Sequence, residues 1–221
     1  MKPIRCAIFD VDGTLADSMH CWQAGATEYL RARGHGDIVT PALLRELRPL
    51  SVIQGVMLLF DRYPDLMKEF TFESYRELIE HHYLTDVSLR TGAREALVAL
   101  RAAGVRMCVI SASFEAALQK LFSRFGLSDF FEFIYTGEHY PKGKKDPAVF
   151  LAALERLSAT PAETLLFEDS LYSAETAHAL GIRIAAIRDE SEPDWEGLRA
   201  ISEIAFEDGA FHLDEIDKIV N

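Results

Sequence analysis

Cysteine is scarce in this sequence, and its cysteines lie far apart. The chain has three, at Cys6, Cys21 and Cys108, and none of them forms a Cys-x-x-Cys pair. An odd number at such distances argues against a disulfide framework. Buried free cysteines behave as small apolar side chains. We therefore expect three buried free thiols in a protein of the reducing cytosol.

Long apolar runs and excess positive charge are also missing. No stretch approaches the roughly 20 apolar residues of a membrane span, and the first apolar run is too short for a secretory signal. Lys and Arg number 23 against 35 Asp and Glu, a formal net charge of −12. Nucleic acid and anionic membranes are therefore poor partners. We expect a cytoplasmic protein and, because no subunit interface is visible in the sequence, a monomer.

Apolar residues make up 49% of the 221 residues, enough for one ordinary domain and a smaller second one. Short apolar runs, typical of strands covered on both faces, alternate with helical patterns. This alternation favours parallel pairing with right-handed crossovers. We predict an α/β fold, a three-layer Rossmann-like parallel sheet. The predicted strands are 6–9, 107–110, 131–135, 164–167 and 182–187, and the predicted helices between them are 93–102, 114–125, 148–157 and 174–180.

Residues 16–89 interrupt this alternation. They contain no convincing strand run, and their apolar residues recur with helical periodicity. We predict an inserted all-helical domain over 16–89 and an α/β core made of 1–15 and 90–221. The helices predicted in the insertion are 22–33, 41–47, 52–63 and 72–83.

The first predicted strand runs into an acidic turn, Asp-Val-Asp-Gly-Thr. Asp10 and Asp12 point the same way in extended chain, and such close carboxylates repel each other unless a cation lies between them. A hard cation such as Mg²⁺ prefers oxygen ligands, and Gly13 permits a sharp turn. An ordinary Asp-Gly turn is the alternative. A calcium loop of the EF-hand type is excluded, because Cys21 stands where its closing glutamate is needed.

Phosphate-binding groups follow the next predicted strand. Ser111 offers a hydroxyl, and the N–H groups of Ala112 and Ser113 face a helix N-terminus, which suits an anion. Taken alone, Ser113 is more simply explained as a helix N-cap. Further on, Lys144 precedes another predicted helix. It could reach into a cleft as a point charge or lie in a solvated basic loop.

A second acid pair, Glu168 and Asp169, ends another predicted strand. Charges after an apolar run are ordinary strand terminators in most proteins. Here all four motifs lie at the carboxyl ends of predicted strands or in the loops that follow. In open α/β sheets that edge is where ligands bind. The motifs therefore converge on one rim, in the order acid pair, hydroxyl, lysine, acid pair.

In this order the motifs resemble those of the haloacid dehalogenase (HAD) superfamily, in the branch with a helical cap inserted after the first motif. The resemblance spans nearly the whole chain, and residues 111–113 and 167–170 are most similar to the β-phosphoglucomutase-like group. The chain departs from the family pattern beside these motifs. The usual Gly-Lys-Pro-x-Pro-Asp has Lys145 for its first proline and Ala148 for its aspartate, and Ser173 stands where glycine is common.

The resemblance implies a Mg²⁺-dependent phosphatase acting on a small phosphorylated metabolite such as a sugar phosphate. It implies that Asp10 forms an aspartyl phosphate and that Asp12 is the general acid and base. Because Asp12 is present, the resemblance favours phosphoester chemistry over dehalogenation. The implied metal ligands are Asp10, Asp12 (through its backbone carbonyl), Glu168 and Asp169, and the implied phosphate-binding groups are Ser111, Ala112 and Lys144.

Substrate choice is expected in the cap, where Arg48 and Ser51 are the candidates by their position in the resembling family. Hinges for cap movement are expected at 16–18 and 88–91. A β-phosphoglucomutase-type mutase has the same core and remains the alternative. It ranks lower because a bisphosphate needs a second phosphate site and the basic residues of the cap are scattered. A non-catalytic binding protein on the same scaffold is the third hypothesis.

Overall fold

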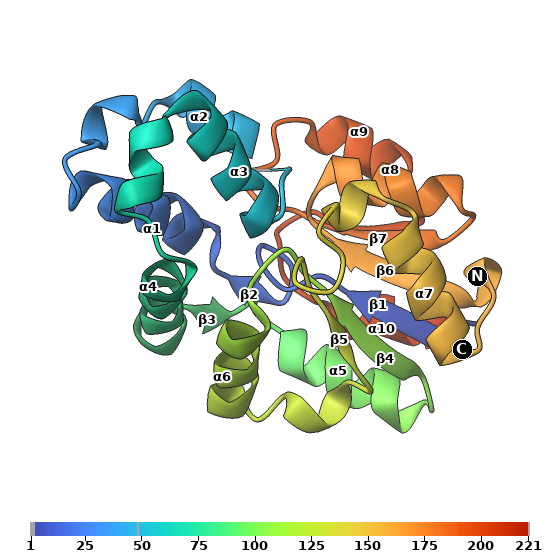
Figure 1. The fold of residues 1–221 in the computed structure, drawn as a ribbon. Helices are drawn as coiled ribbons and strands as arrows, with labels where there is room; N and C mark the ends of the chain where they lie inside the picture. The colour runs from blue at the N-terminus through green and yellow to red at the C-terminus, as the bar shows by residue number, and fades with distance from the viewer. Residues whose placement is uncertain (1–2, 48, 221) are drawn as a thin grey trace.

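A computed structural model describes residues 3–47 and 49–220. Within these residues, six parallel strands form one sheet in the order β5-β4-β1-β6-β7-β8 (Figure 1). The predicted parallel α/β fold is therefore confirmed. The strands are β1 (Cys6–Phe9), β4 (Arg106–Ile110), β5 (Ile134–Tyr135), β6 (Thr164–Glu168), β7 (Arg183–Ile187) and β8 (Ile204–Phe206).

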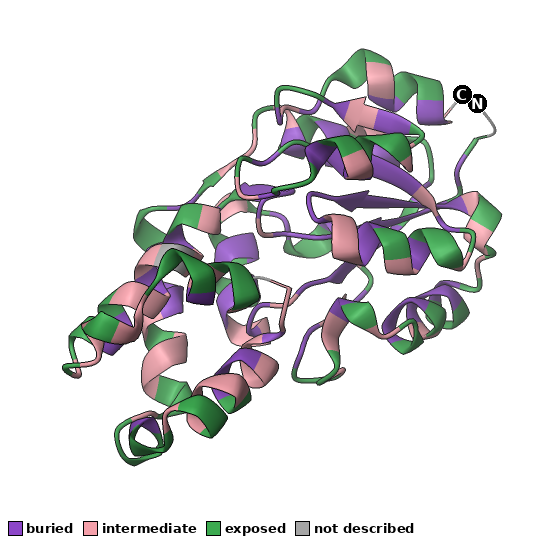
Figure 2. Ribbon diagram, turned by 90° about the horizontal axis from the view of Figure 1, so that it is seen from above, coloured by how far each residue is buried: buried purple, intermediate pink, exposed green. Residues whose placement is uncertain are grey.

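Helices cover both faces of the sheet, and the residues of β1 alternate between them. Ala7 and Phe9 belong to one apolar cluster, whereas Cys6 and Ile8 belong to the other. Both faces of the sheet are buried, which explains why each strand is a continuous apolar run in the sequence. Figure 2 shows the central strands largely buried. The first face is covered by α5 (Ala93–Ala102), α6 (Glu115–Phe125) and α10 (Leu213–Val220), and the second by α7 (Ala148–Leu157), α8 (Leu171–Ala179) and α9 (Trp195–Ala200).

The boundaries differ from the predictions at a few ends. The strand predicted over 131–135 is assigned only at Ile134–Tyr135, although Glu132 N already donates to Met107 O at 2.9 Å. Helix α8 begins at Leu171, three residues before the predicted start, since Leu171 N finds an acceptor in Glu192 at 3.0 Å. The three cysteines are buried free thiols, as predicted.

The segment between β1 and α5 is helical and lies beyond the carboxyl ends of the strands (Figure 1). Helices α1 and α4 pack against each other at Gly25, where an added Cβ would lie 2.8 Å from Ile79 Cδ1. No described helix is long and apolar enough to cross a membrane. The elements of this cap are α1 (Met19–Arg31), η1 (Gly36–Ile38), α2 (Pro41–Leu47), α3 (Val52–Arg62), η2 (Pro64–Lys68) and α4 (Phe72–Thr85).

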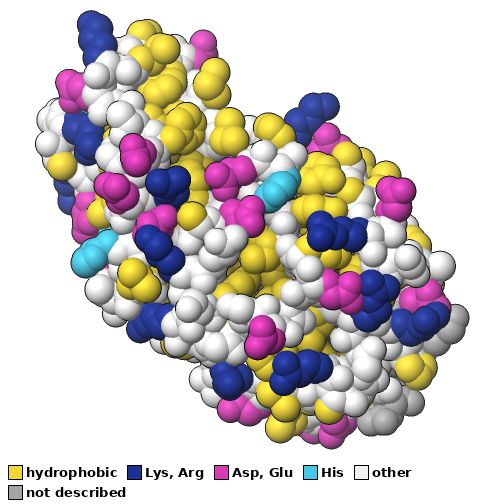
Figure 3. Space-filling view, turned by 60° about the horizontal axis from the view of Figure 1, so that its bottom comes forward, with side chains coloured by type: hydrophobic (Ala, Val, Ile, Leu, Met, Phe, Trp, Pro, Cys, Tyr) yellow, Lys and Arg dark blue, Asp and Glu magenta, His cyan; other side chains and the backbone are white. Residues whose placement is uncertain are grey.

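The chain passes between core and cap through a short two-stranded ribbon. Strand β2 (Ala16–Asp17) pairs antiparallel with β3 (Ser88–Leu89), at the two places where hinges were expected. Arg124 of α6 holds the end of α4 by donating to Tyr83 O at 2.7 Å and Val87 O at 2.8 Å. The C-terminal end of α4 is thus held against the core. On the face shown in Figure 3, acidic and basic side chains are interspersed.

Candidate active site

The site lies at the carboxyl edge of three neighbouring strands. Asp10 follows β1 at the centre, Ser111 follows β4 on one side, and Glu168 ends β6 on the other side. Lys144 comes from η4 (Gly143–Lys145), in the connection after β5. Because the strands are parallel, motifs that are far apart in sequence meet at one rim.

Lys144 is the centre of this group. Its Nζ lies 2.7 Å from Asp10 Oδ1 and 2.7 Å from Glu168 Oε2, and all three side chains are buried. Burial by itself lowers the pKa of Lys144, but attraction by Asp10 and Glu168 outweighs it and holds that pKa well above its usual range. The lysine is therefore a fixed cation in an acidic protein, and the solvated-loop alternative does not apply to it.

Three carboxylates of the site could share a cation. One oxygen each of Asp10, Glu168 and Asp169 lies within 4.8 Å of the others. Asp10 Oδ2 is buried and finds no hydrogen-bond partner among the described residues. Burial raises the pKa of Asp10 to about 7, Lys144 opposes that rise, and Glu168 and Asp12 add to it. An orphaned buried oxygen among acids fits a hard divalent cation, which prefers such ligands.

Gly13 makes room for this carboxylate group. Its φ of +90° lies in the left-handed region, and an added Cβ would stand 2.5 Å from Asp169 Oδ2. Thr14 donates to Asp169 Oδ1 at 3.4 Å from the same turn. Glycine is required here for both its backbone conformation and its lack of a side chain.

Glu168 is held by groups that the sequence did not identify. Ser173 Oγ donates to Glu168 Oε2 at 2.6 Å, and Ser170 N donates to Oε1 at 3.2 Å. Ser173 is one of the residues that depart from the family pattern, and its hydroxyl is what this departure adds to the site. The serine in place of the usual glycine was the only sequence signal for this contact.

Asp12 is oriented by the linker and the cap. Ser18 Oγ donates to Asp12 Oδ1 at 2.6 Å, and Tyr83 Oη, from the end of α4, donates to the same oxygen at 2.5 Å. Tyr83 Oη also lies 3.0 Å from Ser113 Oγ. These two hydroxyls fix the orientation of the Asp12 carboxylate, which does not belong to the three-carboxylate group. No sequence signal identified Tyr83 as a site residue. A tyrosine on the apolar face of a predicted helix is expected to pack in the core.

The predicted phosphate cradle lies beside Asp10 in the next strand's loop. Ser111 Oγ accepts from Ser113 N at 3.1 Å, and Ala112 lines the cavity described below. The Ala112 N–H donates to no other described residue, so it remains available to an anion. Ser113 is not a helix N-cap: Phe114 occupies that position, without a side-chain cap.

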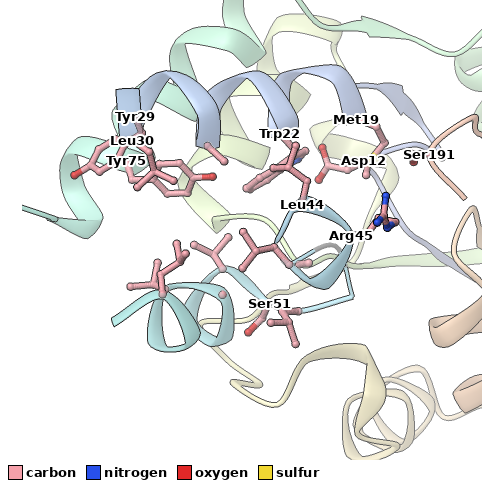
Figure 4. A pocket seen from close by; sticks show the side chains of 18 of the residues that line it. Asp12, Met19, Trp22, Tyr29, Leu30, Leu44, Arg45, Ser51, Tyr75 and Ser191 are labelled. Atoms are coloured by element: carbon pink, nitrogen blue, oxygen red, sulfur yellow. The ribbon is translucent and has the colours of Figure 1, made fainter. Parts of the chain in front are cut away.

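A cavity of about 380 Å³ extends from this rim into the cap. Asp10, Asp12 and Lys144 lie at its end beside the sheet, and Figure 4 shows it continuing between α1 and α3. Ser51, a predicted specificity residue, lines the cavity but is also the N-cap of α3, and its Oγ donates to Pro141 O at 3.0 Å. Arg48, the other predicted specificity residue, lies outside the described residues. Arg45 lines the wall instead.

Comparison with known proteins identifies the class. The profile of the haloacid dehalogenase-like hydrolase family matches residues 7–187. A phosphoglycolate phosphatase of Thiobacillus denitrificans is 32% identical over 196 residues, which cover 84% of this chain and 83% of that protein. Hexitol phosphatase B of Escherichia coli strain K12 is 27% identical over 202 residues, which cover 87% and 88%. The chain belongs to the haloacid dehalogenase-like hydrolase family. It is a phosphoric monoester hydrolase.

Solved structures agree on the fold. CbbY from Rhodobacter sphaeroides, determined in complex with phosphate, has a TM-score of 0.78 and 22% identity over 92% of this chain and 94% of its own. β-Phosphoglucomutase from Clostridium difficile has a TM-score of 0.76 and 17% identity over 99% and 97%. At these identities the likeness establishes the architecture and leaves the choice of reaction to the site.

Proposed function

We propose that the protein is a Mg²⁺-dependent phosphatase of a small phosphorylated metabolite, working through an aspartyl phosphate on Asp10. The observation that carries the proposal is the state of Asp10. It is buried at the end of the cavity, paired through Oδ1 with Lys144, and left with an orphaned Oδ2 beside Glu168 and Asp169. An anionic nucleophile that attacks an anionic phosphate needs a nearby cation, and Lys144 supplies one here.

The chain's residues provide both halves of the reaction. Asp10 attacks phosphorus, its carboxylate oxygen forms the new P–O bond, and the ester oxygen leaves with a proton from Asp12. Water then attacks the phosphorus of the acyl phosphate, Asp12 takes its proton, and phosphate and the Asp10 carboxylate are released. Lys144, the Ser111 hydroxyl and the Ala112 N–H stabilise the charge on the transferring oxygens.

The metal ligands proposed on this chain are Asp10, Glu168 and Asp169, with the backbone carbonyl of Asp12. When bound, Mg²⁺ supplies positive charge that reduces the repulsion between the carboxylate nucleophile and the phosphate. Glu168 is already committed to Lys144 and Ser173. It therefore orients neighbouring groups as much as it contributes charge.

Phosphate release from a panel of sugar phosphates, nucleotides and short-chain phosphates tests this function. We expect release that requires Mg²⁺, stops with EDTA and returns when excess Mg²⁺ is added. A folded protein that releases phosphate from none of them would contradict the proposal. Conversion of a hexose 1-phosphate into its 6-phosphate, without net release, would establish the mutase alternative.

Tyr83 should act as a positioning residue for Asp12. Tyr83→Phe removes one of the two hydroxyls that hold Asp12 Oδ1. A hydrogen bond to a charged group contributes about 1.5–3 kcal/mol, and Ser18 remains in place. We therefore expect kcat for an alkyl phosphate to fall about tenfold. Because an aryl leaving group needs less protonation, kcat for p-nitrophenyl phosphate should fall less.

Tyr63→Phe is the matched control, since Tyr63 ends α3 away from the site. It should leave both rates unchanged. Equal losses on the alkyl and aryl esters in Tyr83→Phe would show that Tyr83 does not act through the proton transfer.

A further inference from the structure

The cavity continues well beyond the space that a phosphoryl group needs. It runs from Asp12 past Trp22 and Leu44 to Tyr29 and Tyr75, and Figure 4 shows these side chains in that order along it. Its volume of about 380 Å³ is within the range of small-molecule sites, roughly 300–1,000 Å³. The far part therefore has room for the organic group of a substrate.

Two polar side chains in the far part, Tyr29 and Arg33, are already engaged, whereas the Tyr75 hydroxyl has no hydrogen-bond partner among the described residues. Tyr29 Oη lies 2.7 Å from Ser74 Oγ and accepts from Thr71 N at 3.1 Å. The Arg33 guanidinium stacks 3.5 Å from the centre of the Tyr29 ring and donates to Glu69 O at 3.3 Å. These groups are held by the cap itself and offer little to a substrate hydroxyl.

Most of the polar groups that remain available lie near the phosphoryl end. Arg45 lines the cavity and forms no hydrogen bond or ion pair with another described residue, and Ser191 Oγ is buried without a partner among them. Figure 4 places both on the Asp12 side of the cavity. The end of the cavity beside the sheet is therefore charged, whereas its walls between α1 and α3 are mainly apolar and the Tyr75 hydroxyl is the available polar group at the far end.

The apolar walls are only half covered. Trp22, Leu44, Leu59 and Phe60 all line the cavity and are all intermediate in exposure. Apolar surface that faces water costs free energy roughly in proportion to its area, and a contiguous apolar patch of this kind marks a binding site. An apolar ligand would cover this surface, whereas a polyol would leave most of its hydroxyls without hydrogen bonds, a costly arrangement.

On this basis, and resting on the phosphatase function proposed above, we propose that the substrate is the phosphate monoester of an apolar alcohol. Its phosphate lies at Asp10, and its alkyl or aryl group extends between α1 and α3 towards Tyr29 and Tyr75. Polyol phosphates and phosphoglycolate, whose organic parts are polar or charged, fit this cavity less well.

A series of n-alkyl phosphates from ethyl to hexyl tests the proposal, beside phosphoglycolate and a hexitol phosphate. We expect kcat/KM to rise by up to about fourfold per methylene until the cavity is filled, and to exceed the values for both polar esters. Flat kcat/KM along the series, or preference for a polar ester, would overturn the apolar-substrate proposal while leaving the phosphatase standing. Release from no ester at all would overturn the phosphatase function as well.

A cavity-filling variant tests whether the preference for long alkyl groups comes from binding in this cavity or from a general preference for hydrophobic substrates. Ala26 lines the wall on α1, one turn beyond Trp22, and Ala26→Phe should shorten the usable space. We expect the ratio of kcat/KM for hexyl over ethyl phosphate to fall at least tenfold. Ala42→Phe, on an exposed position of α2 outside the cavity, should leave that ratio unchanged. An equal ratio in the wild type and Ala26→Phe would contradict the proposed placement.

Discussion

Asp10→Asn should abolish turnover, lowering kcat by on the order of 10⁴- to 10⁶-fold, as the loss of a catalytic nucleophile does elsewhere. An amide oxygen is a poor nucleophile and cannot form the acyl phosphate. Substrate should still bind, because Lys144 and the Ala112 N–H do not depend on the charge of residue 10. No phosphoenzyme should be trapped by acid quenching.

The fold should tolerate this change. Burial raises the pKa of Asp10 to about 7, so in the metal-free protein this buried carboxyl is protonated below that pH and ionised above it, where the buried charge costs stability. The stability linked to this raised pKa is lost as pH rises through 7, and neutral asparagine avoids that loss. We expect thermal unfolding at pH 8, without metal, at no lower a temperature than in the wild type.

Asp37→Asn is the matched control for that variant. Asp37 lies exposed in η1 of the cap, so its substitution removes one acidic charge away from the site. It should keep wild-type kcat and binding. Substantial turnover by purified Asp10→Asn, with no aspartate regained by deamidation, would contradict the assigned nucleophile.

Lys144→Met should damage both activity and stability. The ammonium is the shared partner of Asp10 and Glu168, and removing one member of a buried ion pair typically costs about 3–5 kcal/mol. We expect the free energy of unfolding of the metal-free protein to fall by about that much. Loss of a fixed cation at the transferring phosphoryl group should also lower kcat by about 10²- to 10³-fold.

Urea unfolding and phosphate release measure these two effects separately. Lys142→Met is the control, since Lys142 lies nearby but is exposed and pairs with Asp146 at 3.6 Å. Exposed pairs contribute about 0–1 kcal/mol, so this variant should behave as the wild type. Addition of Mg²⁺ should restore stability more in Lys144→Met, where the acids lack their cation. An unchanged unfolding free energy in metal-free Lys144→Met would show that Lys144 does not hold the carboxylates together.

Residues outside the four sequence motifs orient the carboxylate of Asp12. Tyr83 reaches Asp12 from the end of α4, and Ser18 reaches it from the linker just before α1. The proposed general acid is therefore oriented by the segments that join cap to core. Any displacement of α4 relative to the sheet would change the orientation of Asp12.

The sequence by itself determined the layered architecture and the rim where the motifs meet. Apolar runs and helical periodicity are local properties, and parallel strands bring their carboxyl ends to one edge whatever the loops contain. The positions of Asp10, Ser111, Lys144 and Glu168 on that edge followed from these rules. Predicted element ends were off by a few residues where single hydrogen bonds, such as that of Leu171 N, set the boundary.

Tertiary structure alone decided which groups touch and what the cap encloses. Lys144 meets Asp10 across 134 residues of chain, and Tyr83 meets Asp12 across 71. Contacts at such separations depend on side-chain packing, which no local pattern encodes. For the same reason the expected specificity residue Ser51 serves partly as a helix cap, whereas the apolar cavity arises from half-covered faces of separate helices. Its shape exists only when those helices are placed in space.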